Sequence, residues 1–436
     1  MKIKTRKMSY HEVLALPRLK HKKPLKPSRF LAGFVRVVSA PTLKKIKFSY
    51  TSERMELVGK NEPCLILMNH SSFTDMKLAF GIFYPRRMGI VTSVDAMSGI
   101  LGKLMRWLGC TPTHKYVSDI SLIRDIKYML KENKTSVLMY PEAGYSFDGC
   151  ATAIPKGLGS LMKRLDVPVV TVITEGAFHR DPLYNMLQIR DVKVSARVKC
   201  IATREEIKEK SADELDALLD EAFSFDNFAW QRDNKISINA PYRADGLHRI
   251  LYKCPNCNAE NQMEGKGIHI TCNACSKKWE MDEYGQLVAL DGATEYSHIP
   301  DWYSWQRACV RKEIEDGTYL LDTDVDISIQ VNFDGVCDIG GGHLRHDLDG
   351  FHLTSDDGKL DYKQSPIFTH TLYADYYWYE IGDVIGIGDN DYSYFCFPRS
   401  NASVTKARLA TEELYKIKRV RRSRSREQSV SDEKKN

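Results

Sequence analysis

Three short, uninterrupted apolar runs constrain the fold of this chain more than any other feature. They occupy residues 65–68, 136–140 and 167–173, and helix-like stretches at 121–130 and 153–165 lie between or before them. Strands that are apolar on both faces occur in sheets that helices cover on both sides. The sequence therefore predicts an α/β domain with a largely buried sheet and flanking helices.

The remaining segments differ in texture and suggest further units. We expect, in chain order, a basic amphipathic arm over 1–48 with one helix near 28–39, the α/β domain over 49–235, a small cysteine-rich unit over 250–285, a β-rich domain over 300–418 and a charged, disordered tail over 419–436. A helix over 205–223, with Ser211 and Glu214 as a capping box, would close the α/β domain.

The β-rich domain is indicated by alternation of polar and apolar residues and by turn signals. Residues 324–331 alternate, and Asp-Gly pairs stand at 334–335, 349–350 and 357–358. Apolar residues at helical spacing follow over 404–417. Strands capped by one C-terminal helix resemble, by element order, a pleckstrin-homology-like or GRAM-like module.

Charge is distributed very unevenly. Residues 1–50 carry fourteen lysines and arginines and one acidic residue, whereas residues 321–400 carry fifteen acidic and four basic residues. The basic arm also contains apolar residues, a mixture that favours an interfacial membrane segment over a polyanion-binding arm. A solvated basic arm is the alternative. The opposite charges also suggest that the acidic region folds back on the arm.

Length and composition exclude several classes of protein. The chain has 436 residues, 43% of them hydrophobic and 28% charged, which fits two or three globular domains. We find no run of about 18 uncharged apolar residues, which a spanning helix needs, and no signal-peptide core. We therefore expect a cytoplasmic protein, peripheral on the cytoplasmic face of a membrane.

The residues after the first apolar run carry the clearest chemical signal. His70 and Asp75 are five residues apart, so on one helix they would point about 140° from each other. They meet if His70 ends the strand and Asp75 lies in the first turn beyond it. An aspartate that accepts from one imidazole nitrogen fixes the ring and leaves the other nitrogen to take a proton from a hydroxyl. Taken alone, such a pair is more often structural.

In their order and spacing, the motifs of residues 50–200 resemble those of the glycerolipid acyltransferase family that includes bacterial 1-acylglycerol-3-phosphate acyltransferase. The residues concerned are Asn69, His70, Asp75, Lys115, Pro141, Glu142 and Gly144. The first three match the Asn-His-x4-Asp signature, the fourth ends the basic motif, and the last three lie in a partly matched Pro-Glu-Gly-Thr-like motif. The resemblance implies that His70 and Asp75 are catalytic and that the other five bind substrate.

One departure from the family pattern concerns the acceptor. Residues 143–145 read Ala-Gly-Tyr where the family usually has Gly-Thr-Arg, whose basic residue is credited with holding a phosphate. Tyr145 supplies no charge, and Lys115 offers a point charge in place of an arginine fork. Lys156 and Arg180 are possible substitutes. Acyl transfer is therefore better supported than a phosphate-bearing acceptor.

The resemblance implies transfer of a fatty acyl group from acyl-CoA or acyl carrier protein to a lysophospholipid hydroxyl, in phospholipid biosynthesis. The most direct acceptor is 1-acyl-sn-glycerol 3-phosphate. No Gly-x-Ser-x-Gly elbow is present, so a serine acyl-enzyme is disfavoured. The alternatives are acylation of another glycerolipid or glycolipid hydroxyl and a non-catalytic lipid-binding scaffold. The third alternative is a nucleic-acid-associated module that uses the cysteine-rich unit and the arginine-serine tail. Nucleic acid is not the partner we expect.

Two Cys-x2-Cys pairs, separated by fourteen residues, predict a metal site. Its ligands would be Cys254, Cys257, Cys272 and Cys275. Four thiolates at this spacing are typical of a zinc ribbon, with an iron–sulfur cluster or rubredoxin-like iron as the alternative. Because four ligands leave no open position, the zinc would be structural.

Overall fold

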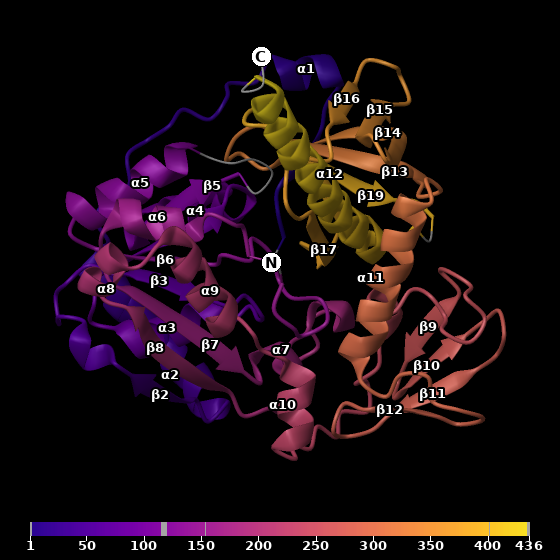
Figure 1. Ribbon diagram of the computed structural model, residues 1–436, viewed down its shortest axis with the longest axis horizontal. Coiled ribbons are helices and arrows are strands. Elements are labelled where there is room, and N and C mark those ends of the chain that lie inside the picture. Colours follow the sequence, from indigo (N-terminus) through magenta and orange to yellow (C-terminus); the bar gives the residue numbers. More distant parts are fainter. Residues whose placement is uncertain (1, 115–119, 153, 401, 434–436) are drawn as a thin grey trace.

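Seven strands form a mixed sheet in the first half of the chain (Figure 1). The computed structural model describes residues 2–114, 120–152, 154–400 and 402–433. The strands are, in spatial order, β2 (Ser49–Glu53), β8 (Ser195–Ala202), β7 (Val169–Glu175), β3 (Leu65–Met68), β6 (Ser136–Met139), β4 (Met88–Ser93) and β5 (Cys110–Thr113). Neighbours are parallel except β7 and β8. The three apolar runs lie in the adjacent strands β7, β3 and β6, as predicted.

Helices cover both faces of this sheet. Along β3, Ile66 and Met68 join the apolar cluster on one face, and Leu65 and Leu67 join the cluster on the other. The first face carries α2 (Arg29–Lys45), α3 (Asp75–Phe83) and α4 (Gly99–Leu108), and the second carries α5 (Ile120–Lys131), α6 (Leu158–Leu165), α8 (Arg204–Glu209) and α9 (Ala212–Ala222). Within the described ranges, no helix combines the length and apolar character that crossing a bilayer requires.

Two helix predictions differ from the structure. The helix expected over 205–223 is two helices, α8 and α9, because the capping box begins a new helix inside it. Ser211 Oγ accepts from the Glu214 N–H at 3.2 Å, and the Glu214 carboxylate accepts from the Ser211 N–H at 2.7 Å. The arm helix expected near 28–39 is α2, which continues to Lys45 through Pro41.

A second, smaller sheet contains the cysteine-rich unit. Its four antiparallel strands are, in spatial order, β12 (Leu287–Ala289), β11 (Lys278–Met281), β10 (His269–Cys272) and β9 (Met263–Lys266). Helix α10 (Asn227–Asp233) precedes this sheet and α11 (Ile299–Glu315) follows it. Trp279 of β11 packs against Trp302 of α11 with ring centroids 5.1 Å apart, so the small sheet shares a core with its neighbours.

The third sheet has eight strands. Seven are antiparallel and lie in the order β16 (Asp361–Gln364), β15 (Gly350–Ser355), β14 (Val336–Asp347), β13 (Leu321–Gln330), β19 (Ser393–Pro398), β18 (Gly382–Gly388) and β17 (Tyr373–Trp378). The three predicted Asp-Gly turns each lie between consecutive strands from β13 to β16. Helix α12 (Val404–Glu433) follows β19 and runs beside α11 (Figure 1).

The eighth strand comes from the amino-terminal arm. Strand β1 (Thr5–Lys7) pairs in parallel with β14, with Thr5 opposite Val336. Helix α1 (Tyr10–Leu14) follows it, and then Arg18 forms an ion pair with Asp391. The suggestion that the acidic region folds back on the basic arm is confirmed for this stretch of the arm.

The tail prediction differs from the structure. Residues 419–433, where the sequence predicts a disordered tail, continue helix α12 as far as Glu433. The segment 404–433 contains no proline or glycine and is rich in arginine, glutamate and lysine. These residues favour helix strongly even when they bury nothing.

Candidate functional site

His70 and Asp75 meet at the carboxyl end of β3. His70 lies in the loop after that strand, and Asp75 is the first residue of α3. His70 Nδ1 lies 2.9 Å from Asp75 Oδ2. The same oxygen accepts from the backbone N–H groups of Ser71 and Ser72 at 2.9 and 3.1 Å. Because a carboxylate only accepts, Nδ1 carries the proton, and Nε2 is the ring nitrogen that does not face Asp75.

The Asp75 carboxyl is 1% exposed. Burial raises its pKa to about 7, although the N–H groups of Ser72 and Ser71 oppose that shift. A buried carboxylate is stabilised when a cation forms beside it. Protonation of His70 supplies such a cation, so the pair favours an imidazole that takes a proton.

Aromatic rings enclose the imidazole of His70. The ring of Tyr145 lies 3.8 Å from it at an angle of 27°, and that of Tyr140 lies 4.1 Å away at 23°. Two near-parallel rings at these distances cannot share one face of an imidazole, so the tyrosines cover opposite faces. Phe73 stacks in turn on Tyr145 at 5.2 Å. The His70 side chain is 17% exposed, which leaves only an edge of the ring for a substrate.

Asn69 and Glu142, expected to bind substrate, hold the His70 loop. Asn69 is fully buried, and its amide oxygen accepts from the Thr174 N–H at 2.8 Å. Glu142 Oε2 accepts from the His70 N–H at 3.0 Å, while Oε1 accepts from the N–H of Thr152 at 2.8 Å and from its hydroxyl at 2.9 Å. Both side chains are occupied by the protein itself, so their contacts support a positioning role.

The burial of Glu142 predicts a pH effect on stability. Burial raises its pKa from 4.5 to about 7, so the folded protein binds a proton more tightly than the unfolded chain. This stabilisation is complete below about pH 4.5 and is lost as pH rises through about 7. In the Glu142→Gln variant the fall in unfolding free energy between pH 4.5 and 8 should be smaller, by as much as roughly 3 kcal/mol.

The measurement is urea denaturation of wild type and variant across that pH range. The exposed Glu205→Gln is the control and should retain the wild-type slope. Parallel curves for wild type and Glu142→Gln would contradict the prediction.

The other predicted substrate residues lie around the same loop. Pro141 is buried beside Glu142, and an added Cβ on Gly144 would meet nothing within 4 Å, so this position faces open space. Ala143 adopts φ +57, a left-handed conformation that favours the glycine the family usually has there. Lys115 lies outside the described residues.

Arg180, considered as a phosphate ligand, lies close to the site but is already paired. It belongs to α7 (Ala177–Arg180) after β7, and its Nη1 donates to Asp181 at 2.8 Å. Asp181 also accepts from the Ser72 hydroxyl at 2.5 Å. Burial raises the pKa of Asp181 to about 6. The Arg180–Asp181 pair thus supports the His70 loop through the hydrogen bond from Ser72 to Asp181.

Sequence reasoning missed the contacts that the C-terminal half of the chain makes with this site and with the turn after β4. Arg408 of α12 donates to the backbone oxygen of Tyr145 at 2.9 Å. Tyr373 and Tyr379 donate to Asp95, in the turn after β4, at 3.2 and 3.1 Å. Nothing in the local pattern of these residues signals contact with a site so distant in sequence.

The four predicted metal ligands come together in the small sheet. The sulfur atoms of Cys254, Cys257, Cys272 and Cys275 all lie within 4.8 Å of one another. Cys254 and Cys275 are 3.8 Å apart, and Cys257 and Cys272 are 3.7 Å apart. A tetrahedral zinc with Zn–S bonds of about 2.3 Å places its sulfurs about 3.8 Å apart. The donor set therefore fits zinc.

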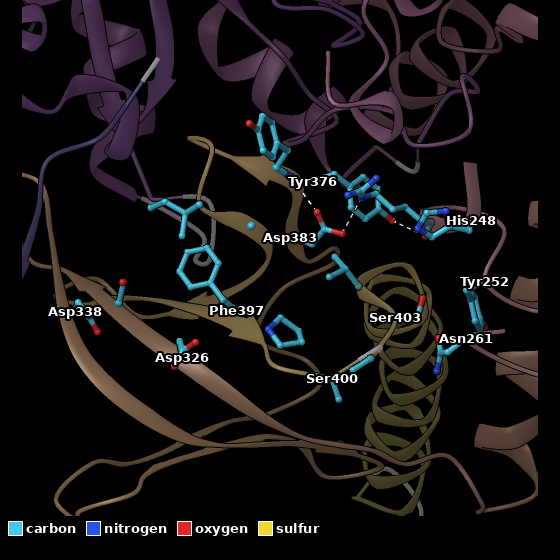
Figure 2. A pocket seen from close by; sticks show the side chains of 18 of the residues that line it. His248, Tyr252, Asn261, Asp326, Asp338, Tyr376, Asp383, Phe397, Ser400 and Ser403 are labelled. Carbon is cyan, nitrogen blue, oxygen red and sulfur yellow. Dashed lines mark hydrogen bonds and ion pairs between the residues drawn. The ribbon is translucent and has the colours of Figure 1, made fainter. Parts of the chain in front are cut away.

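A cavity within the described residues lies elsewhere. It has a volume of about 970 Å³, and Figure 2 shows His248, Asp383, Phe397 and Ser403 around it. Its walls come from β1, the third sheet, the start of α12 and the segment before the small sheet. None of the lining residues belongs to the first sheet or to the His70 loop, so this cavity is separate from the candidate site.

Comparison with known proteins gives one family. A model described as Acyltransferase matches residues 49–175. No curated protein matches this chain. One similar solved structure is the crystal structure of the 1-acyl-sn-glycerophosphate acyltransferase PlsC from Thermotoga maritima, with 17% identity and a TM-score of 0.36, covering 44% of this chain and 76% of that chain. The residues that the family model matches include β3, His70, Asp75 and Glu142. Over residues 49–175, this chain is therefore similar to the acyltransferase family.

Proposed function

We propose that this chain is a glycerolipid O-acyltransferase that uses acyl-CoA or acyl carrier protein as donor and a lysophospholipid hydroxyl as acceptor. The observation that carries the proposal is the contact of 2.9 Å between His70 and Asp75 inside a domain of the acyltransferase family. A scaffold without catalysis would not need an aspartate whose single oxygen serves the ring and the loop together.

The proposed reaction needs no enzyme nucleophile. His70 Nε2 removes the proton of the acceptor hydroxyl as its oxygen attacks the thioester carbonyl carbon. Asp75 holds the ring and stabilises the imidazolium. The tetrahedral intermediate then collapses, the C–S bond breaks, and the sulfur leaves with the proton that His70 returns. The products are the new ester and the free thiol of the donor.

The acceptor is tested directly. Purified protein is given labelled acyl-CoA or acyl carrier protein with a panel of lysolipids, headed by 1-acyl-sn-glycerol 3-phosphate. We expect transfer to at least one lysophospholipid and to no free sugar or protein. Preference for an acceptor without phosphate would favour the alternative glycerolipid reaction, and no transfer by folded, metal-loaded protein would favour the lipid-binding scaffold.

The membrane contact proposed for the arm is supported by an exposed apolar face. Four residues of α2 at helical spacing are at least half exposed, namely Phe30, Phe34, Val37 and Val38. Helix α4 adds Ile100, Leu101, Leu104 and Trp107, all at least 45% exposed. The two helices adjoin, since the Ser28 N–H donates to the Trp107 oxygen at 3.0 Å. The same two helices and the segment before α2 also carry exposed basic residues, Lys26, Arg29, Lys44, Lys45 and Lys103, which suits an anionic membrane surface.

Replacing Phe30 and Trp107 with serine together should lower the partition onto vesicles at least about 10-fold, because burying each ring contributes roughly 1.5–3 kcal/mol. Co-sedimentation with phosphatidylcholine vesicles containing phosphatidylglycerol measures it. The control replaces Val288 and Leu290, apolar residues of the small sheet that are 51% and 54% exposed. If the Phe30/Trp107 variant bound vesicles as well as wild type at low salt, the proposal that this face contacts the membrane would be wrong.

Two further assignments belong to this proposal. We infer that the four cysteines hold a structural zinc, supported by the spacing of their sulfurs. We also infer a pleckstrin-homology-like module over 300–418, supported by two antiparallel meanders that join at β13 and β19 and by the helix that follows. Contact with a cytoplasmic membrane face would agree with the unbridged state of all eleven cysteines.

A further inference from the structure

Helix α12 reaches the catalytic loop from far along the chain. Arg408 is 2% exposed, and its Nη1 donates to the Tyr145 backbone oxygen at 2.9 Å. Its guanidinium carbon lies 4.3 Å from the centre of the Phe147 ring. A buried cation from the C-terminal half thus contacts the segment that contains Glu142 and Tyr145.

The guanidinium is fixed on its own side of this contact. Its Nε donates to Glu412 at 3.2 Å, and Glu412 also accepts from Arg307 at 2.7 Å and from Thr371 at 2.9 Å. Although burial alone would raise it, Arg307 and Arg408 lower the pKa of Glu412 to about 2. Arg408 Nη2 is buried without a hydrogen-bond partner in the described structure. A fold keeps an incompletely satisfied buried arginine only at a cost, which a functional contact would explain.

A short path leads from this arginine to the catalytic ring. The Tyr145 backbone is held by Arg408, and its side chain stacks on His70 at 3.8 Å. The next residue, Ser146, donates from its N–H to the His70 backbone oxygen at 3.0 Å. A shift of the Tyr145 backbone would therefore move both a ring face and a backbone contact of His70.

The third sheet also contacts loops at the carboxyl edge of the first sheet at other points. Tyr376 of β17 packs against Phe147 with ring centroids 4.6 Å apart. Asp95, after β4, accepts from Tyr373 and Tyr379 of the β17–β18 hairpin. The loops at the carboxyl edge of the catalytic sheet are thus supported by the β-rich region.

We propose that α12 completes the active site from outside the acyltransferase domain, with Arg408 as a positioning residue that holds the ring of Tyr145 against His70. Arg408 touches no reacting group, since its guanidinium is buried between Phe147, Glu412 and the Tyr145 backbone. The inference rests on the proposed function for its kinetic test, and a second test is independent of acyl transfer.

The kinetic test uses Arg408→Met in the full chain. We expect kcat to fall about 10- to 100-fold with KM changed less than about 3-fold, because misplacement by about 1 Å has effects of this size. Arg307→Met is the matched control, since Arg307 pairs with Glu412 and Glu413 and, among the described residues, forms no hydrogen bond or ion pair with the loop. It should lower the melting temperature similarly and keep kcat within about 3-fold of wild type.

The independent test is the ring-proton NMR signal of His70, assigned with His70→Gln. A stacked tyrosine shields these protons, so the signal should move downfield in Arg408→Met and stay in place in Arg307→Met. This result needs no acyl transfer, so it separates a failure of this inference from a failure of the proposed function. An unmoved signal in folded Arg408→Met would overturn the inference, whatever the acyl-transfer activity.

A second variant serves if Arg408→Met does not fold. Tyr145→Leu removes the ring and keeps the backbone oxygen for Arg408. It should lower kcat about 10- to 100-fold with KM changed less than about 3-fold, because it removes the ring that Arg408 is proposed to hold against His70. Full activity of Tyr145→Leu would also overturn the inference.

Discussion

Alanine at position 70 should lower kcat about 10³-fold, because general-base catalysis contributes about 10²–10⁴. The loss should appear with every acceptor that wild type uses. The His70 side chain bonds Asp75 through Nδ1, whereas its loop is held by backbone contacts to Glu142 and Ser146 that alanine retains. The variant should therefore fold, and the measurement is the initial rate of acyl transfer beside the melting temperature.

Two further variants make this result specific. His352→Ala removes a histidine of β15 whose side chain is 39% exposed, and it should retain wild-type activity. Asp75→Asn places an amide where Nδ1 donates, so the ring would turn or change tautomer and the rate should fall markedly. Retention of more than about a third of wild-type activity by folded His70→Ala would rule out general-base catalysis by this residue.

Loss of the metal should be the largest single effect on stability. A structural zinc contributes on the order of 10 kcal/mol to the folding of zinc-finger peptides. Cys254 and Cys272 are fully buried in the same apolar cluster as Trp279 and Trp302. Cys272→Ser should therefore release the metal and loosen the packing of the small sheet against α11, at a cost of several kcal/mol in unfolding free energy.

Metal analysis and limited proteolysis measure this effect. We expect one zinc per wild-type chain, none in Cys272→Ser, and new cleavage within residues 250–290 of the variant. Cys309→Ser, a half-buried cysteine of α11 outside the metal cluster, is the control. Iron in place of zinc would support the rubredoxin-like alternative. A stable wild-type protein whose four thiols react freely without bound metal would refute the site.

The local elements of the first sheet could be predicted because their signals are local. A run such as Leu65–Met68 is apolar at every position, and only a strand covered on both faces buries it fully. The spacing of His70 and Asp75 already required a strand end followed by a helix start, which the structure confirms. The turns between β13 and β16 could likewise be predicted, because an Asp-Gly pair of adjacent residues is enough to indicate a turn.

What could not be predicted depends on contacts between distant residues. The break between α8 and α9 depends on which of two competing signals dominates, helical periodicity or the cap at Ser211. The rings beside His70 come from a loop whose path is set by Glu142 and Thr152. Arg408 sits in a segment whose periodicity indicates only a helix, and its partner lies 263 positions earlier.

The pairing of β1 with β14 bears on the order in which this protein can assemble. Residues 5–7 leave the ribosome long before residues 336–338 exist, so β1 stays unpaired with β14 while the domain of the first sheet is synthesised. The acidic sheet is then the element that captures it. In a chain truncated after α11, β14 would be missing and β1 would have no strand to pair with. This short basic segment would then be exposed to other partners. Activity lost on such truncation would therefore reflect damage at both ends of the molecule.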